Sequence, residues 1–326
     1  MSEINPRHVY GSLDLKQLGT FLAVADARSI TRAADVLHLV QPAVSRQIKL
    51  LEEALGTPLF QRKRHGVELT EAGTILASHA RRSLQELERA RAEIAARSAP
   101  VSGIVTVGLL PSTCDLLSSR LVTAVERQHP GIRLRVSASY AGDLQQMLEA
   151  GDIDLALLYA PRHSEALQLR PLLDERLWVV GTPAQRLHRD RPFALSRLDG
   201  QRVVLPSAPH GLRRLVDHAC ALAGVTLDVV AETNSMNVQK NLVIGGHGLS
   251  ILPSIAVVGE VARGDLSAAP LCEPPLSRRI VLAMSALRPA GPAVRYVVDA
   301  LTRCARDAVD SGDWMEGRWL GPTEAG

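Results

Sequence analysis

Polar side chains between residues 41 and 49 have the types and spacing of a surface that contacts nucleic acid. Gln41 carries an amide, Ser45 a hydroxyl, Arg46 a guanidinium and Lys49 an ammonium group. At 100° per residue, these positions and Pro42 fall on one side of a helix. Arginine pairs with guanine and glutamine with adenine, while basic side chains also bind phosphates. We therefore expect Gln41, Ser45 and Arg46 to contact base edges and Lys49 a nearby phosphate or base.

The opposite side of the same segment is apolar. Val44, Ile48 and Leu51 recur at helical spacing, so one face packs while the polar face stays exposed. Gly56 is placed to end this helix. Two shorter apolar-periodic segments precede it, and Ser29 is the expected N-cap of the second. Three short helices, the third with a basic outer face, predict a helix-turn-helix unit whose recognition helix enters the major groove.

A short hairpin with a basic tip is predicted directly after these helices. Residues 60–70 alternate weakly and turn at His65-Gly66, which indicates two short strands. Arg62 and Arg64 lie at this tip, where they suit phosphate or minor-groove contact. Arg32, in the second helix, is expected to contact phosphates as well. The alternative for any one of these residues is an ordinary solvated position, and for Gln41 a helix cap. Pro42 fits the first helical turn, because its missing N–H has no intrahelical partner there.

A series of short motifs in fixed order resembles the N-terminal domain of LysR-type transcriptional regulators. The motifs are Ala33-Ala34, Gln41-Pro42-Ala43-Val44-Ser45-Arg46-Gln47-Ile48, Leu51-Glu52, Leu55-Gly56, Leu59-Phe60 and Leu69-Thr70-Glu71-Ala72-Gly73. The resemblance implies a winged helix-turn-helix domain over residues 14–73, after a leader of residues 1–13. It also implies sequence-specific binding to promoter DNA.

The distribution of charge agrees with a DNA-binding front third. The net charge is +3; residues 1–97 hold 14 Lys and Arg against 11 Asp and Glu, and the remainder holds equal numbers. A basic run by itself is usually a solvated face. Here the excess coincides with the predicted helix and hairpin, which favours an electrostatic role toward DNA.

The cysteines and the hydropathy pattern indicate a cytoplasmic protein without a membrane partner. Cys114, Cys220, Cys272 and Cys304 are widely separated and form no CxxC motif, as expected of reduced thiols rather than a metal site. Redox sensing by one of them is an alternative, but burial as a small hydrophobe is favoured. The N-terminus lacks a signal-peptide core, and no apolar run approaches the roughly 20 residues of a membrane helix.

A long helix is predicted from residue 70 to about residue 97, with residues 74–98 as a linker. Apolar residues recur at positions 76, 80, 84, 87 and 94. An exposed seam of this kind usually pairs with a copy of itself, although it could instead pack on its own domain. The family resemblance implies a linker helix that joins two subunits, and tetramers are usual in the family. Pairing would hold two recognition helices at a fixed separation on a dyad-symmetric site.

The rest of the chain is predicted to be an α/β effector-binding domain in two lobes. Residues 99–103 are expected to be a hinge. Strand and helix patterns then alternate, which argues for a parallel sheet covered by helices. Gly151-Asp-Ile-Asp-Leu-Ala, Leu173-Asp-Glu-Arg-Leu-Trp-Val-Val-Gly181 and Gly246-His-Gly-Leu-Ser-Ile-Leu-Pro253 resemble the periplasmic-binding-protein-like domain of the same family. The predicted parts are a domain over 104–310, with lobe I at about 104–178 and 271–310, lobe II at about 179–270, and a tail over 311–326.

The effector site is expected where helices begin beyond the carboxyl ends of strands, because free backbone N–H groups lie there. The family resemblance points to the hydroxyl at Ser112, the loop near Tyr140 and the loops of lobe II. The candidate residues are Ser112, Thr113, Tyr140, Ser207, His210, Arg213 and Ser235. Ser112 and Ser207 could instead be helix caps. A basic pair at His210 and Arg213 suits a carboxylate, so we expect a small anionic effector.

Motifs that would indicate an enzyme are absent from the sequence. It contains no GxSxG elbow, Walker-type loop, HExxH or GxGxxG after a strand. An exported solute-binding protein would share the two lobes, but it would need an export signal and no winged helix. We therefore expect a regulator with no cofactor and no metal. Its expected partners are double-stranded promoter DNA, a small effector and a second copy of itself, with RNA polymerase as a further candidate. The effector must bind two arrangements of the protein with different affinities to change DNA binding.

Overall fold

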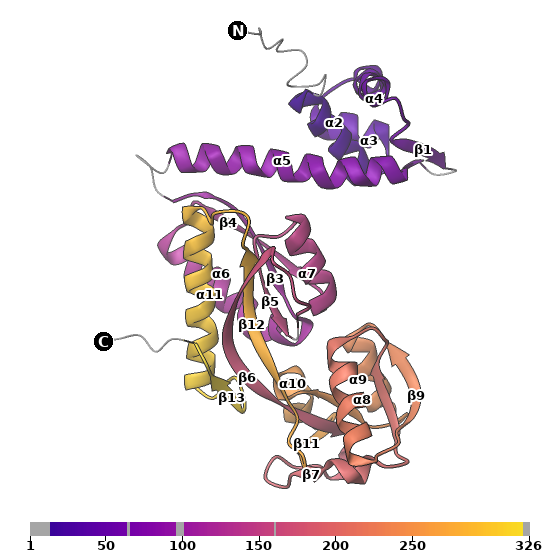
Figure 1. Cartoon of the computed structure of the whole chain (residues 1–326), viewed down its shortest axis with the longest axis vertical. Coiled ribbons are helices and arrows are strands. Elements are labelled where there is room, and N and C mark those ends of the chain that lie inside the picture. Colours follow the sequence, from indigo (N-terminus) through magenta and orange to yellow (C-terminus); the bar gives the residue numbers. More distant parts are fainter. Residues whose placement is uncertain (1–13, 64–65, 96–100, 160, 322–326) are drawn as a thin grey trace. The chain divides into compact units, whose positions relative to one another are not determined.

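The chain divides into two compact units, Met1–Ala95 and Ala96–Gly326 (Figure 1). The structure is a computed structural model that describes residues 14–63, 66–95, 101–159 and 161–321. The expected leader, Arg64 at the hairpin tip and residues 99–100 of the expected hinge lie outside these residues.

The N-terminal unit begins with three helices around a small core. They are α2 (Leu15–Ala27), α3 (Ile30–Leu37) and α4 (Gln41–Leu55). Phe21, Val44 and Leu51 are fully buried between them. Ser29 caps α3 as predicted, since its Oγ accepts a hydrogen bond from the Arg32 N–H at 3.3 Å. Gly56 ends α4 with a φ of 68°, in the left-handed region that glycine tolerates.

The predicted hairpin is present and is joined to the helices at two points. Strands β1 (Phe60–Lys63) and β2 (Gly66–Leu69) pair antiparallel. A carboxylate oxygen of Glu52, in α4, accepts the Leu59 N–H at 2.7 Å. At the other point, Gly66 has a φ of 137°, and an added Cβ would lie 2.3 Å from the Arg28 carbonyl oxygen. Only glycine fits this close approach of the hairpin to the end of α2.

Helix α5 (Glu71–Ala95) is the predicted long helix, and its seam is used in two ways. Thr70 begins it, because the Thr70 Oγ1 accepts the Gly73 N–H at 3.0 Å. Ala77 and Ala80 are buried in the core of the N-terminal unit. Farther along, Leu87 is exposed. The first turns of the seam thus pack on their own domain, as the alternative interpretation held, while Leu87 is available to a partner.

Lobe I of the C-terminal unit is built on a sheet with helices packed against it (Figure 1). Its elements are β3 (Gly103–Leu109), α6 (Pro111–Gln128), β4 (Ile132–Ala138), α7 (Ala141–Ala150), β5 (Leu155–Tyr159), β12 (Ser277–Ser285) and α11 (Pro292–Asp310). The order across the sheet is β4-β3-β5-β12-β6, with β6 spanning Leu167–Gly181. Strand β3 is parallel to both β4 and β5.

Lobe II continues from the far end of β6. Its elements are β7 (Phe193–Ala194), β8 (Arg202–Pro206), α8 (Gly211–Ala223), β9 (Asp228–Thr233), α9 (Met236–Ile244), β10 (Ser250–Pro253), α10 (Val258–Arg263), β11 (Ser267–Cys272) and the single turns Pro183–Gln185, Leu195–Leu198 and Ser254–Ala256. Strands β8 and β9 are parallel, whereas β10 and β11 are antiparallel to β6. The prediction of a parallel sheet therefore holds only in part. Strands β6 and β12 pair antiparallel with each other, and no crossover helix is needed between them.

Residues 311–321, the described part of the expected tail without pattern, contribute to the core instead. Strand β13 (Gly317–Trp319) pairs antiparallel with residues 173–175 of β6. Trp314 is only 1% exposed, and its indole N–H donates to Glu175 at 2.9 Å. A three-residue strand has no readable period, so the sequence pattern gave no signal for it.

Candidate functional site

The predicted DNA-contacting face of α4 is exposed in the structure. Gln41, Pro42, Arg46 and Lys49 are exposed and Ser45 is half-buried. The Gln41 amide donates to the Ser45 Oγ at 2.9 Å, which holds these two side chains together on the face. The geometry matches the prediction that one side of the helix packs and the other is free to contact a partner.

The other basic residues predicted to contact DNA are Arg32, Arg62 and Arg64. Arg32 is exposed on α3. Arg62 belongs to β1, but its side chain, like all of Arg64, lies outside the described residues. Lys49 forms an ion pair with Glu53 at 3.6 Å in which both side chains are well exposed. Such a pair contributes little, so the Lys49 ammonium group can exchange it for a phosphate.

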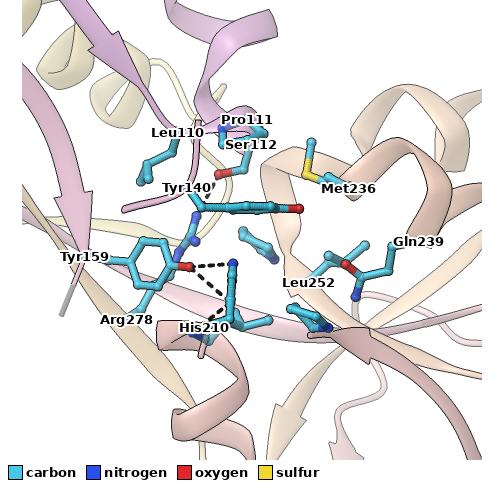
Figure 2. A pocket seen from close by; sticks show the side chains of 13 residues that line it. Leu110, Pro111, Ser112, Tyr140, Tyr159, His210, Met236, Gln239, Leu252 and Arg278 are labelled. Carbon is cyan, nitrogen blue, oxygen red and sulfur yellow. Dashed lines mark hydrogen bonds between the residues drawn. The ribbon is translucent and has the colours of Figure 1, made fainter. Parts of the chain in front are cut away.

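A pocket in the C-terminal unit lies between lobe I and lobe II (Figure 2). It encloses about 340 Å³ between its lining atoms, including the part that opens to solvent. Its polar side chains are Ser112, Tyr140, Tyr159, His210, Gln239 and Arg278. Its apolar lining residues are Leu110, Pro111, Pro206, Leu212, Met236, Leu252 and Pro253.

Four helices begin at this pocket. Pro111 is the first residue of α6 and Met236 that of α9, while Tyr140 and His210 are the N-caps of α7 and α8. Each N-terminus carries partial positive charge and presents N–H groups.

Side chains cap α8 and α9, but α6 and α7 have no side-chain cap. At α6 the Ser112 N–H is the one placed to bind an anion, because Pro111 has no N–H and the Thr113 N–H bonds to the Leu110 carbonyl at 2.8 Å. The first N–H groups of α7 can also bind an anion, although the Asp143 carboxylate in its first turn opposes one.

Arg278 brings the only formal charge among the residues that line the pocket. Its side chain is buried, and its Nη2 donates to the Ser112 Oγ at 2.7 Å (Figure 2). Its Nε donates to Glu175, which is fully buried behind the pocket. Its guanidinium carbon lies 4.5 Å from the centre of the Tyr159 ring. Because Ser112 accepts from Arg278, its own hydroxyl proton is free to be donated to a ligand.

His210 is a neutral member of the pocket. Its Nδ1 accepts the Leu212 N–H at 3.2 Å, so in the neutral ring Nε2 carries the proton and donates to the Tyr159 Oη, 3.0 Å away. Burial, and then the charges of Arg278 and Arg214, lower the pKa of His210 to about 4. Burial raises the pKa of Tyr159 to about 12. At neutral pH, His210 is uncharged and the Tyr159 hydroxyl keeps a proton that it can donate.

Tyr140 closes the pocket across the two lobes. It precedes α7 in lobe I, and its ring stands edge-on to His210 of lobe II, with 4.5 Å between the centres. Burial raises the pKa of Tyr140, and a hydrogen bond from the Met236 backbone opposes this shift. Ligand binding at this point would contact both lobes at once.

Comparison with known proteins identifies both units. Residues 15–74 match the model of the bacterial regulatory helix-turn-helix protein, lysR family. Residues 98–305 match the LysR substrate binding domain. The chain belongs to the LysR family of transcriptional regulators.

Individual relatives agree with this family assignment. The chain is 32% identical over 259 residues to the HTH-type transcriptional regulator BbuR of Bordetella bronchiseptica, covering 79% of this chain and 80% of that protein. It is 27% identical over 304 residues to the dual regulator OxyR of Escherichia coli K12, covering 91% and 96%. These relatives are transcriptional regulators rather than enzymes.

Solved structures share the fold of this LysR-family protein. Full-length OxyR from Pseudomonas aeruginosa, a cysteine variant, matches with a TM-score of 0.69 at 24% identity, over 91% of this chain and 96% of that one. CbnR, a LysR family transcriptional regulator, matches with a TM-score of 0.69 at 22% identity, over 90% of this chain and 99% of that one.

The described part of the chain has no helix long and apolar enough to cross a membrane. It also holds no group of three His, Cys, Asp or Glu residues placed to bind a metal.

Three of the seven predicted effector residues line the pocket of this LysR-family protein: Ser112, Tyr140 and His210. Three hydroxyl residues do not. The Thr113 Oγ1 donates to the Leu110 carbonyl, Ser235 caps α9, and Ser207 lies outside the lining.

Arg213 is the main correction to the predicted site. Its guanidinium donates to both carboxylate oxygens of Asp217 at 2.9 Å and also to Glu232, so two acidic groups already hold it, away from the pocket. His210 does line the pocket, but it is neutral there. Arg278 therefore takes the place of the expected basic pair. Arg278, Tyr159 and Gln239 line the pocket but were not predicted from the sequence. Their strands and helix carried no signal of a site, because only tertiary contacts bring them to the loops around Ser112.

The lowered pKa of His210 predicts a loss of stability in mild acid. The unfolded chain takes up this proton near pH 6.5, the folded chain only near pH 4. Stability contributed by the neutral ring is therefore present above pH 6.5 and is lost as the pH falls from 6.5 to 4. Urea unfolding at pH 7 and pH 5 should show a larger loss for the wild type than for His210→Gln. Equal losses in the two proteins would contradict this prediction.

Proposed function

We propose that this LysR-family regulator binds a small anionic metabolite in the pocket between its lobes, and that occupancy changes how it binds promoter DNA. The observation that carries the proposal is the convergence of Arg278 with the uncapped N-termini of α6 and α7 on one pocket. The Ser112 and Tyr159 hydroxyls add two neutral donors. Charge-assisted hydrogen bonds of this kind suit a carboxylate.

The apolar side of the pocket supports a ligand with a small hydrocarbon body. Met236 and Leu252 line it, away from the Ser112 and Arg278 contact (Figure 2). The charge of Arg278 is already partly neutralised by its ion pair with Glu175. An anionic ligand would therefore be bound by Arg278 together with the neutral hydroxyl and backbone N–H donors of the pocket. A carboxylate end at Ser112 and Arg278, with an apolar body toward Met236, uses both kinds of lining.

On the DNA side, we propose base contacts by Gln41, Pro42, Ser45 and Arg46, in line with the exposed face of α4. Phosphates would be contacted by Lys49, Arg32, Arg62 and Arg64.

A second copy would pair through the exposed part of α5 at Leu87, which places two such faces on one duplex. The effector then acts as an allosteric ligand, because it binds two arrangements of the protein unequally. We propose that the protein works in the cytoplasm.

Peroxide sensing is a second candidate, since hydrogen peroxide-inducible genes activators are among the relatives. Thiolates, not thiols, react quickly with oxidants. Burial raises the pKa of Cys114, Cys220 and Cys304, which disfavours the thiolate in each. The pocket therefore supports a metabolite better than these three cysteines support an oxidant.

Isothermal titration of the full-length protein with a panel of small carboxylates tests the effector proposal. Ser112→Ala should weaken binding of the best carboxylate by roughly tenfold, because it removes a buried donor worth about 1 to 1.5 kcal/mol. Ser207→Ala is the matched control, since Ser207 lies outside the lining, and it should leave affinity unchanged. If no carboxylate binds, or if both variants bind like the wild type, the proposal fails.

Two substitutions on α4 separate base contacts from phosphate contacts. Arg46→Ala should cost about 1 to 3 kcal/mol of discrimination between the preferred duplex and a random one. Lys49→Ala should weaken binding to both duplexes alike and reduce the salt dependence. Fluorescence anisotropy at several salt concentrations measures both quantities. An equal loss on both duplexes for Arg46→Ala would assign it to the backbone.

A further inference from the structure

Val40 is an unusual residue for the place it occupies. It is the N-cap of the recognition helix α4, with extended backbone angles (φ −80°, ψ 141°) and no side-chain cap hydrogen bond. Valine is among the poorest N-caps, because it has no oxygen to accept the first free N–H groups. Its side chain is also 71% exposed, so burial in the folded domain does not account for it.

The side chain of Val40 takes no part in capping the helix. The Ala43 N–H, which a polar cap at position 40 would accept, bonds back to the Val40 carbonyl at 2.9 Å, and Pro42 has no N–H. A serine here could therefore add only a second acceptor for the Ala43 N–H. The exposed isopropyl group of Val40 adds nothing to the helix and is suited to an apolar contact outside the domain.

Building on the DNA contact proposed for α4, on which this step rests, we infer that Val40 contacts a thymine methyl group in the major groove and helps to select the DNA sequence. The N-terminal residues of a recognition helix are the ones that contact base edges. Val40 directly precedes the exposed Gln41 and Pro42 at that end. Thymine alone of the four bases presents a methyl group in the major groove, and apolar side chains pack against it. Burying one methyl group corresponds to about fourfold in affinity.

Comparing thymine with uracil isolates this contact, because the two bases differ only by the methyl group. The full-length protein first selects its preferred duplex from a random-sequence library. Its affinity is then measured at one fixed salt concentration for that duplex and for copies with uracil at each thymine in turn. The wild type should lose about fourfold at one or more thymines. Val40→Ser should bind the thymine duplex about fourfold more weakly, with no further loss when uracil replaces that thymine.

Val36→Ser is the matched control. Val36 is likewise exposed, at 70%, but lies on α3 rather than at the start of α4. This variant should keep the uracil sensitivity of the wild type. Thermal unfolding separates function from folding: Val40→Ser should not lower the Tm of the N-terminal unit, because an exposed side chain is replaced, although the variant binds DNA less tightly.

Three results would overturn the inference. The first is a chain that selects no preferred duplex, and the second is a wild type that tolerates uracil at every position. The third is a Val40→Ser variant that keeps the full uracil sensitivity at every thymine, which would assign the exposed valine to a protein partner instead.

Discussion

Glu175→Gln should lower the free energy of unfolding of the C-terminal unit by about 3 to 5 kcal/mol, because it leaves a buried guanidinium without its counter-charge. The Glu175 side chain is fully buried and accepts hydrogen bonds from the Arg278 Nε and from the Trp314 Nε1. Arg278 is itself only 7% exposed, so water cannot replace the lost carboxylate. Glutamine keeps the size of the side chain, but it removes the charge and replaces one of the two acceptor oxygens with an amide N–H donor.

Asp174, the preceding residue, supplies a control for this substitution. Its carboxylate pairs with Arg279 at 2.9 Å and with Arg318 at 2.7 Å, and these arginine side chains are 57% and 76% exposed. The hydrogen bond from Arg279 is the main cause that lowers the pKa of Asp174. Exposed pairs contribute about 0 to 1 kcal/mol, so Asp174→Asn should cost little. Urea unfolding followed by circular dichroism compares the two variants, and equal losses would contradict the role given to burial.

Trp314→Ala should cost about 3 to 5 kcal/mol, the range found when a buried aromatic side chain is removed from a core. Trp314 is packed in the main core of the C-terminal unit, although its segment was expected only to be a tail without a readable pattern. The substitution also removes the indole N–H from Glu175. Trp314→Phe retains much of the apolar burial, so it should cost less, about 1 to 3 kcal/mol for the unsatisfied carboxylate oxygen.

Trp319→Ala is the comparison that tests this assignment. Trp319 is half-buried, and its indole nitrogen is buried without a hydrogen-bond partner among the described residues. Its removal should therefore cost less than that of Trp314. Urea unfolding gives the order directly, and a larger loss for Trp319→Ala would show that Trp314 does not tie the C-terminal segment to the core.

The sequence by itself determined the exposed polar face of α4, because that face is local. All the residues of this face belong to one continuous helix, α4. Its period of 3.6 residues places Val44 and Ile48 on the buried side and Arg46 and Lys49 on the exposed side. Motifs in fixed order along one stretch also identified the family. The helix starts around the pocket were predictable for the same reason, since a strand followed by a helix is a local pattern.

Only the tertiary structure decided which side chains face the effector pocket. Arg278 meets Ser112 across 166 residues of sequence, and Glu175 meets Trp314 across 139. Nothing in the spacing of these residues signals the contact, because the long strands β6 and β12 and the short strand β13 bring them together. Arg213 shows the converse: a cation at a cleft loop looked suited to a carboxylate, but folding places Asp217 and Glu232 beside it. Periodicity predicts which face of an element is buried, whereas the partner of a charged group depends on which elements meet.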